Sequence, residues 1–533
     1  MTSAIQQLPL GRSGFPALRD SNAIYVDKTE MVCKLAENDG KLSFARPRRF
    51  GKSLLISTFE TLFKNGLRDF KGLTIEKLWK DKTYSVVRLD FSEVKNFRTR
   101  EEFTERFFSY IAKNLGEVGF QPQEGGNLAL QISSWLGNRP SRSLVVLIDE
   151  YDAPLVICLD KEELFRDVRM VMSSFFSTLK SKDDCLRFLF MTGITKFSST
   201  SIFSDFNDLT DISLNPEYGA LVGYTESEIE RYFDFYINEA AKVLGLPREE
   251  ILSELKANYD GFSFDSEAST RVYCPWSVLS FFNNPNAGFR NYWYSSGGHA
   301  VVLMQYLKGH ELDDPAKYAE TKKVWLRDLV TPKEYECLDR DVLLYQAGYL
   351  TIQSITPNEV ALLSYPNLEV ASSMAQLYAD KLLSGVPYTP RNNVRLETVL
   401  AQRTAGDVVD RFNDVINAMD YQRFPVVDEA SCRAYLQVLM MGADMVPRVE
   451  AHHSALGRSD LEVEAGNRLW VFEIKFARNA SQVSDLLKEA VEQMQMKRYG
   501  QGPHDKELIQ LALVFSASER RFVVWQQVCE SAQ

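Results

Sequence analysis

A short C-terminal segment contains acidic and basic residues in a pattern suited to catalysis. Residues 457–477 read GRSDLEVEAGNRLWVFEIKFA, in which a Gly-Asn pair separates two runs of strand-forming residues. Such a pair favours a two-residue hairpin turn, and the turn fixes how the two strands pair. Counting outward from it, Asp460 faces Glu473, and because side chains alternate along a strand, Lys475 shares their face. The sequence therefore predicts two carboxylates and a lysine on one face of a hairpin.

Two facing carboxylates repel each other, which favours a divalent cation between them. Oxygen ligands without cysteine or histidine suggest Mg²⁺ or Mn²⁺, with Asp460 and Glu473 as the metal ligands. The metal would polarise a phosphodiester and lower the pKa of a bound water, while Lys475 would position that water or stabilise the developing charge. The alternative interpretation is an exposed hairpin held by cross-strand salt bridges.

Three further residues are candidates for the same site. Glu429 begins a predicted helix, DEASCRAYLQVLM, and could give a third carboxylate. Gln493 and Tyr499 belong to a later helical pattern, LLKEAVEQMQMKRY, and are expected to face the same cleft. With these groups the pattern predicts a site that cuts phosphodiesters.

A second candidate site lies near the N-terminus, where residues 46–53 read RPRRFGKS. A phosphate-binding loop needs a strand, a tight turn and a helix whose first amides face the anion, and the surrounding pattern supplies all three. Gly51 would let the backbone approach the phosphates, Lys52 would reach the β- and γ-phosphates, and Ser53 would ligate Mg²⁺. Arg46 stands where the motif usually has glycine, a departure that bears on the conformation of the loop.

The other half of a nucleotide site is expected at the ends of neighbouring strands. The run LVVLIDEYD places Asp149 in the Mg²⁺ shell and Glu150 where it can orient or deprotonate the attacking water. Thr192, at the end of the next strand, would lie beside the γ-phosphate, and Arg48 or Arg49 would add phosphate contacts. GKS alone occurs by chance and IDEYD alone could be a solvated turn, but together and in this order they favour nucleotide binding. We assign no arginine finger from the sequence.

The composition narrows the class of protein. The chain has 533 residues, 45% of them hydrophobic, and a formal net charge of −11, which argues against a broad non-specific nucleic-acid coat but leaves a local basic groove open. We find neither a secretory signal nor an apolar run of membrane-spanning length. Seven cysteines are scattered singly, which predicts free thiols in a reducing compartment. These features predict a cytoplasmic protein of several domains.

The hydrophobic periodicity places the two sites on different scaffolds. In the N-terminal third, four short apolar runs alternate with helical patterns, which predicts a buried parallel sheet. A helical region begins near residue 224 with a capping box of Thr225 and Glu228, and Trp276 and Trp293 are expected in its core rather than as a base-stacking platform. Residues 300–420 are predicted to be mostly helical, and a helix, a hairpin, a helix and a strand follow.

These motifs carry a resemblance to two known families. The segments RPRRFGKS, IDEYD, TGITKFSSTSIFSDFNDLTDISL and YDGFSF…VYCPWSVLSFF resemble the AAA-ATPase-like family. The segments GRSDLEVE and WVFEIKFA are similar to the PD-(D/E)XK nuclease-like domain usually fused to it. The resemblance implies that Arg46 is a habit of the family and that the C-terminal part has the restriction-endonuclease fold. It carries over ATPase roles to Lys52, Ser53, Asp149 and Glu150, and nuclease roles to Asp460, Glu473 and Lys475, with Glu429 and Gln493 as flanking positions.

The predicted architecture is therefore α/β. We expect an AAA-like P-loop ATPase domain in residues 1–222, a helical lid in 223–300, a helical middle region in 301–420 and a PD-(D/E)XK nuclease-like domain in 421–533. The predicted function is ATP binding and hydrolysis coupled to Mg²⁺-dependent cleavage of nucleic acid, DNA being favoured over RNA. ATP and Mg²⁺ are the expected cofactors, with Mn²⁺ as an alternative at the nuclease site. A homo-oligomer and a role in defence against foreign DNA are suggested by analogy alone.

Two other functions fit the same sequence. In the first, the protein is a nucleotide-controlled switch whose C-terminal domain binds nucleic acid or a protein without cutting. In the second, it is an ATPase motor or clamp with the nuclease as an accessory. The intact acid-acid-lysine set argues against the first, and the dependence of ATP hydrolysis on DNA would test the second.

Overall fold

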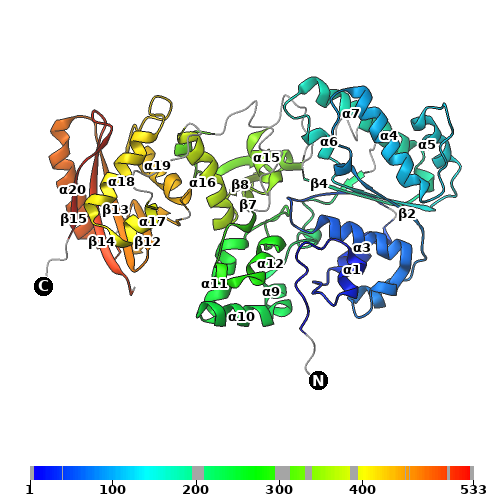
Figure 1. The fold of residues 1–533 in the computed structure, drawn as a ribbon, viewed down its shortest axis with the longest axis horizontal. Coiled ribbons are helices and arrows are strands. Elements are labelled where there is room, and N and C mark those ends of the chain that lie inside the picture. Colours follow the sequence, from blue (N-terminus) through cyan, green and yellow to red (C-terminus); the bar gives the residue numbers. More distant parts are fainter. Residues whose placement is uncertain are drawn as a thin grey trace. The chain divides into compact units, whose positions relative to one another are not determined.

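The computed structural model describes residues 5–38, 40–194, 209–293, 313–330, 339–383, 394–443, 445–449, 452–454, 457–500 and 505–528. The chain forms two compact units. Unit 1 comprises residues 1–310 and 321–370, and unit 2 comprises residues 311–320 and 371–533. Each unit contains its own five-stranded sheet, and Figure 1 shows the course of the chain through both.

The central sheet of unit 1 is parallel, with the strand order β2-β3-β4-β1-β5. The four strands predicted from the sequence are all present, and β5 adds a fifth. Strands β3 and β4 are buried along their whole length, which explains their nearly continuous apolar sequences. The strands are β1 (Lys41–Ala45), β2 (Ser85–Asp90), β3 (Leu144–Asp149), β4 (Leu186–Gly193) and β5 (Leu209–Asp211).

Helices cover both faces of this sheet. In Figure 1, α1 and α3 lie on one face and α4 to α7 lie on the other. Helix α3 directly follows the phosphate-loop sequence, so the first turn of the helix and the carboxyl ends of the strands meet at one edge of the sheet. The helices are α1 (Phe15–Asp20), α2 (Thr29–Glu37), α3 (Lys52–Asn65), α4 (Arg100–Gly116), α5 (Leu128–Gly137), α6 (Ala153–Val156) and α7 (Glu162–Ser181).

A helical segment follows the sheet, as predicted. The capping box at its start is present, with the side chains of Thr225 and Glu228 each bonded to the other's backbone N–H. Trp293 is buried as expected, at 1% exposure. Apolar residues at three- and four-residue spacing, among them Ile229, Phe233 and Ile237, form the core of the segment. Its helices are α9 (Glu226–Tyr232), α10 (Asp234–Leu244), α11 (Arg248–Tyr259) and α12 (Pro275–Asn283).

The middle region contains helices, as expected, and also three short strands that the sequence analysis did not predict. The strands form a sheet of order β6-β8-β7. Arg271 donates hydrogen bonds to the carbonyl oxygens of Ile352 and Gln353, at 2.6 and 2.8 Å, and so attaches this sheet to the helical segment. The elements are β6 (Lys322–Trp325), α14 (Leu326–Val330), α15 (Arg340–Ala347), β7 (Thr351–Ile355), β8 (Val360–Ser364) and α16 (Leu368–Leu382).

Unit 2 is built on a mixed sheet of order β15-β14-β13-β12-β9. The pair β13-β14 is parallel and its neighbours are antiparallel. Helix α20 lies on one face of the sheet and α17 and α18 lie on the other (Figure 1). The elements are α17 (Leu396–Gln402), α18 (Ala405–Ala418), α19 (Glu429–Met441), β9 (Arg448–Val449), β10 (His452–Ser454), β11 (Gly457–Arg458), β12 (Leu461–Ala465), β13 (Arg468–Ala477), α20 (Val483–Lys497), β14 (Glu507–Ser516) and β15 (Arg521–Val528).

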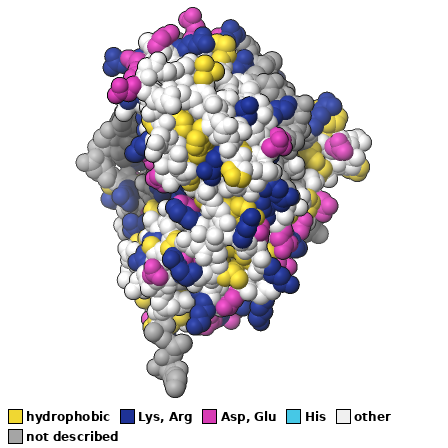
Figure 2. Space-filling view, turned by 90° about the vertical axis from the view of Figure 1, so that its right-hand side faces the viewer, with side chains coloured by type: hydrophobic (Ala, Val, Ile, Leu, Met, Phe, Trp, Pro, Cys, Tyr) yellow, Lys and Arg dark blue, Asp and Glu magenta, His cyan; other side chains and the backbone are white. Residues whose placement is uncertain are grey.

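The distribution of charged side chains, the character of the helices and the state of the cysteines follow the composition of the sequence. On the face drawn in Figure 2, Lys and Arg side chains are interspersed with Asp and Glu side chains rather than gathered by sign. Among the described helices, none has both the length and the apolar character that crossing a membrane requires. Five cysteines in the described part of the chain are free thiols, and all five are buried: Cys33, Cys158, Cys185, Cys274 and Cys432.

Candidate functional site

The phosphate-loop sequence of unit 1 forms a turn between β1 and α3. Gly51 is the N-cap of α3 and has a φ of 97°, a conformation open to glycine and rarely adopted by other residues. Arg49 also has a positive φ, of 70°. The turn therefore leads directly into the first turn of α3, where an anion site at a helix N-terminus would lie.

Arg46 is a structural anchor of this loop and does not point toward a phosphate. Its side chain is 2% exposed, and it donates hydrogen bonds to the carbonyl oxygens of Ser213 and Tyr218, at 2.7 and 3.2 Å. The guanidinium lies between the rings of Phe44 and Phe264, 4.2 and 4.6 Å from their centroids. Burial lowers the pKa of Arg46 to about 10. An arginine in place of the usual glycine thus ties the loop to segments far away in the sequence.

Lys52 is buried at the first turn of α3. Its Nζ donates to the carbonyl oxygens of Arg46 and Pro47, each at 2.9 Å. Burial lowers the pKa of Lys52, against the opposing charges of Asp149 and Glu150. The backbone of its own loop therefore holds the ammonium group of this lysine.

Of the acids predicted at the strand end near this lysine, Asp149 is buried and Glu150 is half-buried. Burial raises the pKa of Asp149, while a hydrogen bond from Ser53 and the charge of Lys52 oppose the rise. Burial also raises the pKa of Glu150, whose φ is 46°. Asp149 Oδ2 and the Thr192 hydroxyl are buried and have no hydrogen-bond partner among the described residues. Buried oxygens are normally bonded, so these two fit Mg²⁺ and a bound nucleotide.

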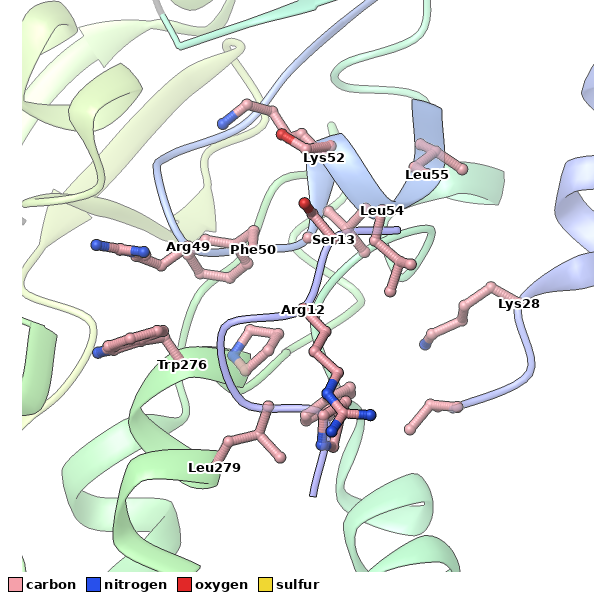
Figure 3. A pocket seen from close by; sticks show the side chains of 18 of the residues that line it. Arg12, Ser13, Lys28, Arg49, Phe50, Lys52, Leu54, Leu55, Trp276 and Leu279 are labelled. Atoms are coloured by element: carbon pink, nitrogen blue, oxygen red, sulfur yellow. The ribbon is translucent and has the colours of Figure 1, made fainter. Parts of the chain in front are cut away.

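A cavity of about 500 Å³ opens beside the loop. Arg48, Arg49, Gly51, Lys52, Ser53 and Glu150 line it, whereas Asp149 and Thr192 are not part of its lining. Figure 3 shows the residues that the sequence analysis missed: Arg12 and Lys28 reach the cavity from the N-terminal segment, and Trp276 and Leu279 reach it from α12.

The expectation for Trp276 was wrong in one respect. Trp276 is half-buried and lines the cavity, and the guanidinium of Arg49 lies 4.3 Å from the centroid of its ring (Figure 3). The core position was expected because large aromatic side chains are mostly buried, and most of the other apolar residues of α12 are indeed buried. The pattern could not show that this turn of α12 faces the phosphate loop.

Two further charged residues accompany the acids at the strand ends. Asp90 pairs in register with Asp149 across β2 and β3, and its charge contributes to the raised pKa of both Asp149 and Glu150. Arg88 Nη2 lies 3.8 Å from Asp149 Oδ2. The signal for Asp90 was present in the sequence, since it ends the apolar run SVVRLD just as Asp149 ends LVVLID.

The second site lies on the β12-β13 hairpin of unit 2, whose predicted register is confirmed. Ala465 pairs with Arg468 and Leu461 pairs with Phe472. One step further out, Asp460 Oδ2 accepts a hydrogen bond from the backbone N–H of Ile474, at 2.8 Å. Asp460 is thereby held at the end of the hairpin, beside Glu473.

Glu473 and Lys475 form a buried pair on the face of the sheet that α20 covers. Lys475 Nζ donates to Glu473 Oε1 and to Gln493 Oε1, each at 3.1 Å. Gln493 in turn donates to the hydroxyl of Tyr499, at 3.1 Å. The structure therefore brings together the predicted pair and both groups expected from the later helix.

The electrostatics of the pair fit a bound cation. Burial and then the charge of Asp460 raise the pKa of Glu473 to about 7, against the charges of Lys475 and Lys497. Burial lowers the pKa of Lys475, but Glu473 first, and then Glu429 and Asp460, outweigh it, so that the pKa is raised. Glu473 Oε2 is buried and has no hydrogen-bond partner among the described residues. An acceptor in that state fits a metal ion.

Helix α19 completes this site. Glu429, its first residue, is exposed, and its charge reaches Lys475. Arg433, one turn later, donates to Asp460 Oδ1 at 3.3 Å. Within the described residues, no group of three or more His, Cys, Asp and Glu side chains is arranged to hold a metal. Two carboxylates suffice for Mg²⁺, which usually keeps several waters and binds substrate phosphates.

The fold combines a parallel α/β unit that carries the phosphate-loop sequence with a second unit built on a mixed sheet that carries the acid-acid-lysine set. Residues 9–203 match the family described as Predicted AAA-ATPase, and residues 434–525 match the PD-(D/E)XK nuclease superfamily. The chain thus carries a predicted AAA-ATPase domain followed by a PD-(D/E)XK nuclease superfamily domain. It is also similar to an uncharacterized protein in the vnfD 5′ region of Azotobacter chroococcum mcd 1, with 29% identity over 487 residues, 88% of this chain and 89% of that protein.

Proposed function

We propose that the protein binds and hydrolyses ATP in unit 1 and cuts nucleic acid with Mg²⁺ in unit 2. The observation that carries the nuclease assignment is the buried Oε2 of Glu473, which has no hydrogen-bond partner in the part of the chain that the structure describes and lies beside Asp460 and the buried Lys475. A hairpin held only by salt bridges would leave such carboxylates exposed to water, whereas Glu473 is 1% exposed. A buried carboxylate oxygen without a partner is unfavourable unless a ligand binds it.

In unit 2 each residue has a definite task. Asp460 and Glu473 would hold the metal, which when bound polarises the phosphodiester and acidifies a water. Lys475, fixed by Glu473 and Gln493, would hold a water or the developing negative charge in place. Tyr499 orients Gln493, and Glu429 supplies a further carboxylate at the exposed edge. Hydrolysis would break one bridging P–O bond, join the hydroxide of a water to phosphorus, and leave the proton of that water on the departing oxygen.

In unit 1 the tasks divide in a similar way. Lys52 and the first amides of α3 would bind the β- and γ-phosphates, with Arg48 and Arg49 beside them in the cavity. Ser53 and Asp149 would hold Mg²⁺. Glu150 would orient the attacking water or take its proton, a task that its raised pKa suits.

The test is cleavage of supercoiled DNA, single-stranded DNA and RNA by the purified protein with Mg²⁺, with and without ATP, beside Asp460→Ala. Cleavage that requires both Asp460 and ATP is the expected result for coupled units. Cleavage without ATP would make unit 1 a targeting or gating part. Cleavage that persists in Asp460→Ala would overturn the assignment of the site.

One observation favours a second candidate, a nucleotide-controlled switch that binds without cutting. The described residues supply two side chains, Asp460 and Glu473, as metal ligands, and Asp460 is already bonded to Arg433 and to the backbone of Ile474. Binding of a nucleic acid or protein that responds to ATP, with no cleavage of any substrate in the panel, would support this function over the first.

A further inference from the structure

Arg433 lies at the accessible side of the nuclease site and belongs to neither of the motifs that define it. The side chains of Arg433 and Asp460 are 23% and 20% exposed, whereas those of Glu473 and Lys475 are 2% and 9% exposed. A polymeric substrate must approach from the exposed side. It therefore meets the Arg433–Asp460 edge before the buried pair.

The position of Arg433 is set by a rigid element. Helix α19 begins with a capping box in which Asp428 and Ser431 each bond the other's backbone, and Glu429 and Arg433 are one turn apart on the same face. Sites carried by helices are held more closely than sites carried by loops. The guanidinium thus has a fixed place 3.3 Å from a carboxylate proposed to bind the metal.

The cations of the site differ in what they can offer a substrate. Lys475 is buried, with its Nζ bonded to Glu473 and Gln493, whereas Arg433, which is bonded to Asp460, is partly exposed. A guanidinium presents a planar fork of N–H groups that matches two phosphate oxygens, whereas an ammonium acts as a point charge. We propose that Arg433 binds a backbone phosphate of the nucleic acid next to the bond that is cut. This inference rests on the proposed nuclease function of unit 2.

Arg433 is expected to affect the binding of nucleic acid and the binding of metal in different ways. A phosphate contact through Arg433 contributes to the affinity for nucleic acid and to its salt dependence. The same positive charge opposes a cation at Asp460 by Coulomb repulsion. Replacing Arg433 by a neutral residue should therefore weaken the binding of nucleic acid without weakening the binding of metal. A residue that only holds Asp460 in place would have the opposite signature, because its loss would disorder a metal ligand.

The experiment uses the full chain with Arg433→Gln, Arg433→Lys and, as a matched control, Arg521→Gln. Arg521 is an exposed arginine of the same unit that pairs with Glu519 at 2.8 Å. Binding of fluorescein-labelled duplex DNA, single-stranded DNA and RNA is measured by anisotropy in EDTA over a range of salt concentrations. Binding of Mn²⁺ is measured by calorimetry, and thermal unfolding reports the integrity of each variant.

For the nucleic acid that the wild type binds most tightly, we expect Arg433→Gln to weaken binding roughly tenfold or more. The slope of log affinity against log salt should fall by about 1. Arg433→Lys should keep the slope, Arg521→Gln should change neither quantity, and Mn²⁺ affinity in Arg433→Gln should equal or exceed that of the wild type.

Three results would overturn the inference. An unchanged salt slope in Arg433→Gln, while the wild type binds and cuts, removes the phosphate contact and leaves the nuclease function intact. Loss of Mn²⁺ affinity together with a lower melting temperature, again at an unchanged slope, makes Arg433 a structural support of Asp460. Failure of the wild type to bind or cut any of the three nucleic acids overturns the proposed function and this inference with it.

Discussion

The two sites of this protein pair a buried lysine with a buried acid in opposite ways. In unit 1, Lys52 donates to two backbone carbonyl groups of its own loop, and burial lowers its pKa. In unit 2, Lys475 donates to the side chains of Glu473 and Gln493, and the neighbouring acids raise its pKa despite burial. The first lysine is held by neutral dipoles that an incoming phosphate can replace, whereas the second is bound to a carboxylate that stays in the site.

Both sites nevertheless contain a buried acid oxygen that has no hydrogen-bond partner among the described residues, Asp149 Oδ2 in unit 1 and Glu473 Oε2 in unit 2. Each lies where the proposed metal would bind. The two lysines therefore have different hydrogen-bond partners, whereas the two acids are both proposed to bind a metal. This contrast predicts that unit 1 binds its anion through Lys52, and that unit 2 relies on the metal and on Arg433 for the first contact with its anion.

The largest expected effect is that of Asp460→Ala on cleavage. Loss of a metal ligand should reduce the cleavage rate by at least about a hundredfold, while ATP affinity stays at the wild-type value because unit 1 is unchanged. Nuclease assays and nucleotide titrations on the same preparation check both halves. Lost ATP binding with retained cleavage would contradict the division of tasks between the units.

Glu369 is a third buried carboxyl group, and it shows how burial changes the pKa of an acid that has no cation bonded to it in the hydrogen bonds given below. Glu369 accepts hydrogen bonds from the Ser277 hydroxyl and the Trp293 backbone, both at 2.7 Å and both from neutral donors. Burial raises its pKa to about 8. Between pH 4.5 and 8 the folded chain keeps a proton that the unfolded chain has lost, so this group contributes stability at low pH that disappears as the pH rises to about 8.

We therefore expect Glu369→Gln to flatten the pH dependence of unfolding. The wild type should lose on the order of 4 kcal/mol relative to the variant between pH 4.5 and pH 8. Chemical denaturation of both proteins across this range, followed on the transition of unit 1, measures the difference. Parallel pH profiles would show that Glu369 does not hold its proton in the folded state.

A smaller effect is expected for Lys52→Ala. Removing the charged donor should weaken ATP binding roughly tenfold or more, without a change in nucleic-acid binding by unit 2. Lys64→Ala, at the exposed last turn of the same helix, is the matched control and should bind ATP normally. Equal ATP affinity in the wild type and Lys52→Ala would remove the phosphate-loop interpretation.

The smallest expected effect concerns the Arg49–Trp276 contact. Trp276→Leu removes the ring under the guanidinium, a contact that contributes about 0.5–1 kcal/mol at partly exposed sites, so ATP affinity should fall by only a few-fold. Trp325→Leu is the control, because Trp325 forms a similar contact with Arg327 outside the cavity. An equal effect of the two substitutions would mean that Trp276 does not act through the nucleotide cavity.

Structural features that depend only on residues close together in the chain can be predicted from the sequence alone. The Gly466-Asn467 turn and the alternation of side chains predict the hairpin register, and the structure confirms it from Ala465–Arg468 to Leu461–Phe472. Asp460 lies one residue beyond the paired strands, where it accepts a hydrogen bond from the backbone N–H of Ile474. The capping box of Thr225 and Glu228 was equally readable. Turn type, strand alternation and helix capping act over a few residues, so the local sequence contains all the information that they need.

Features that depend on distant segments required the tertiary structure. Arg46 looked like a departure from the loop motif until Ser213, Tyr218 and Phe264 were seen around it. Trp276 looked like a core residue until α12 was placed against the phosphate loop. Such contacts join residues separated by many positions, and no periodicity in either partner encodes which other segment it will meet.

Two further features also depend on segments that are distant in the sequence. They are the sheet of β6, β7 and β8 and the role proposed for Arg433. Strands of four or five residues that no neighbouring motif marks carry too little periodicity to be told from loops. Arg271 of the helical segment bonds the backbone of β7, a contact between segments distant in the sequence. Arg433 stands in an ordinary amphipathic helix. The chain thus encodes the chemical groups of both sites locally, whereas long-range packing decides which charges surround them and from which side a substrate can reach them.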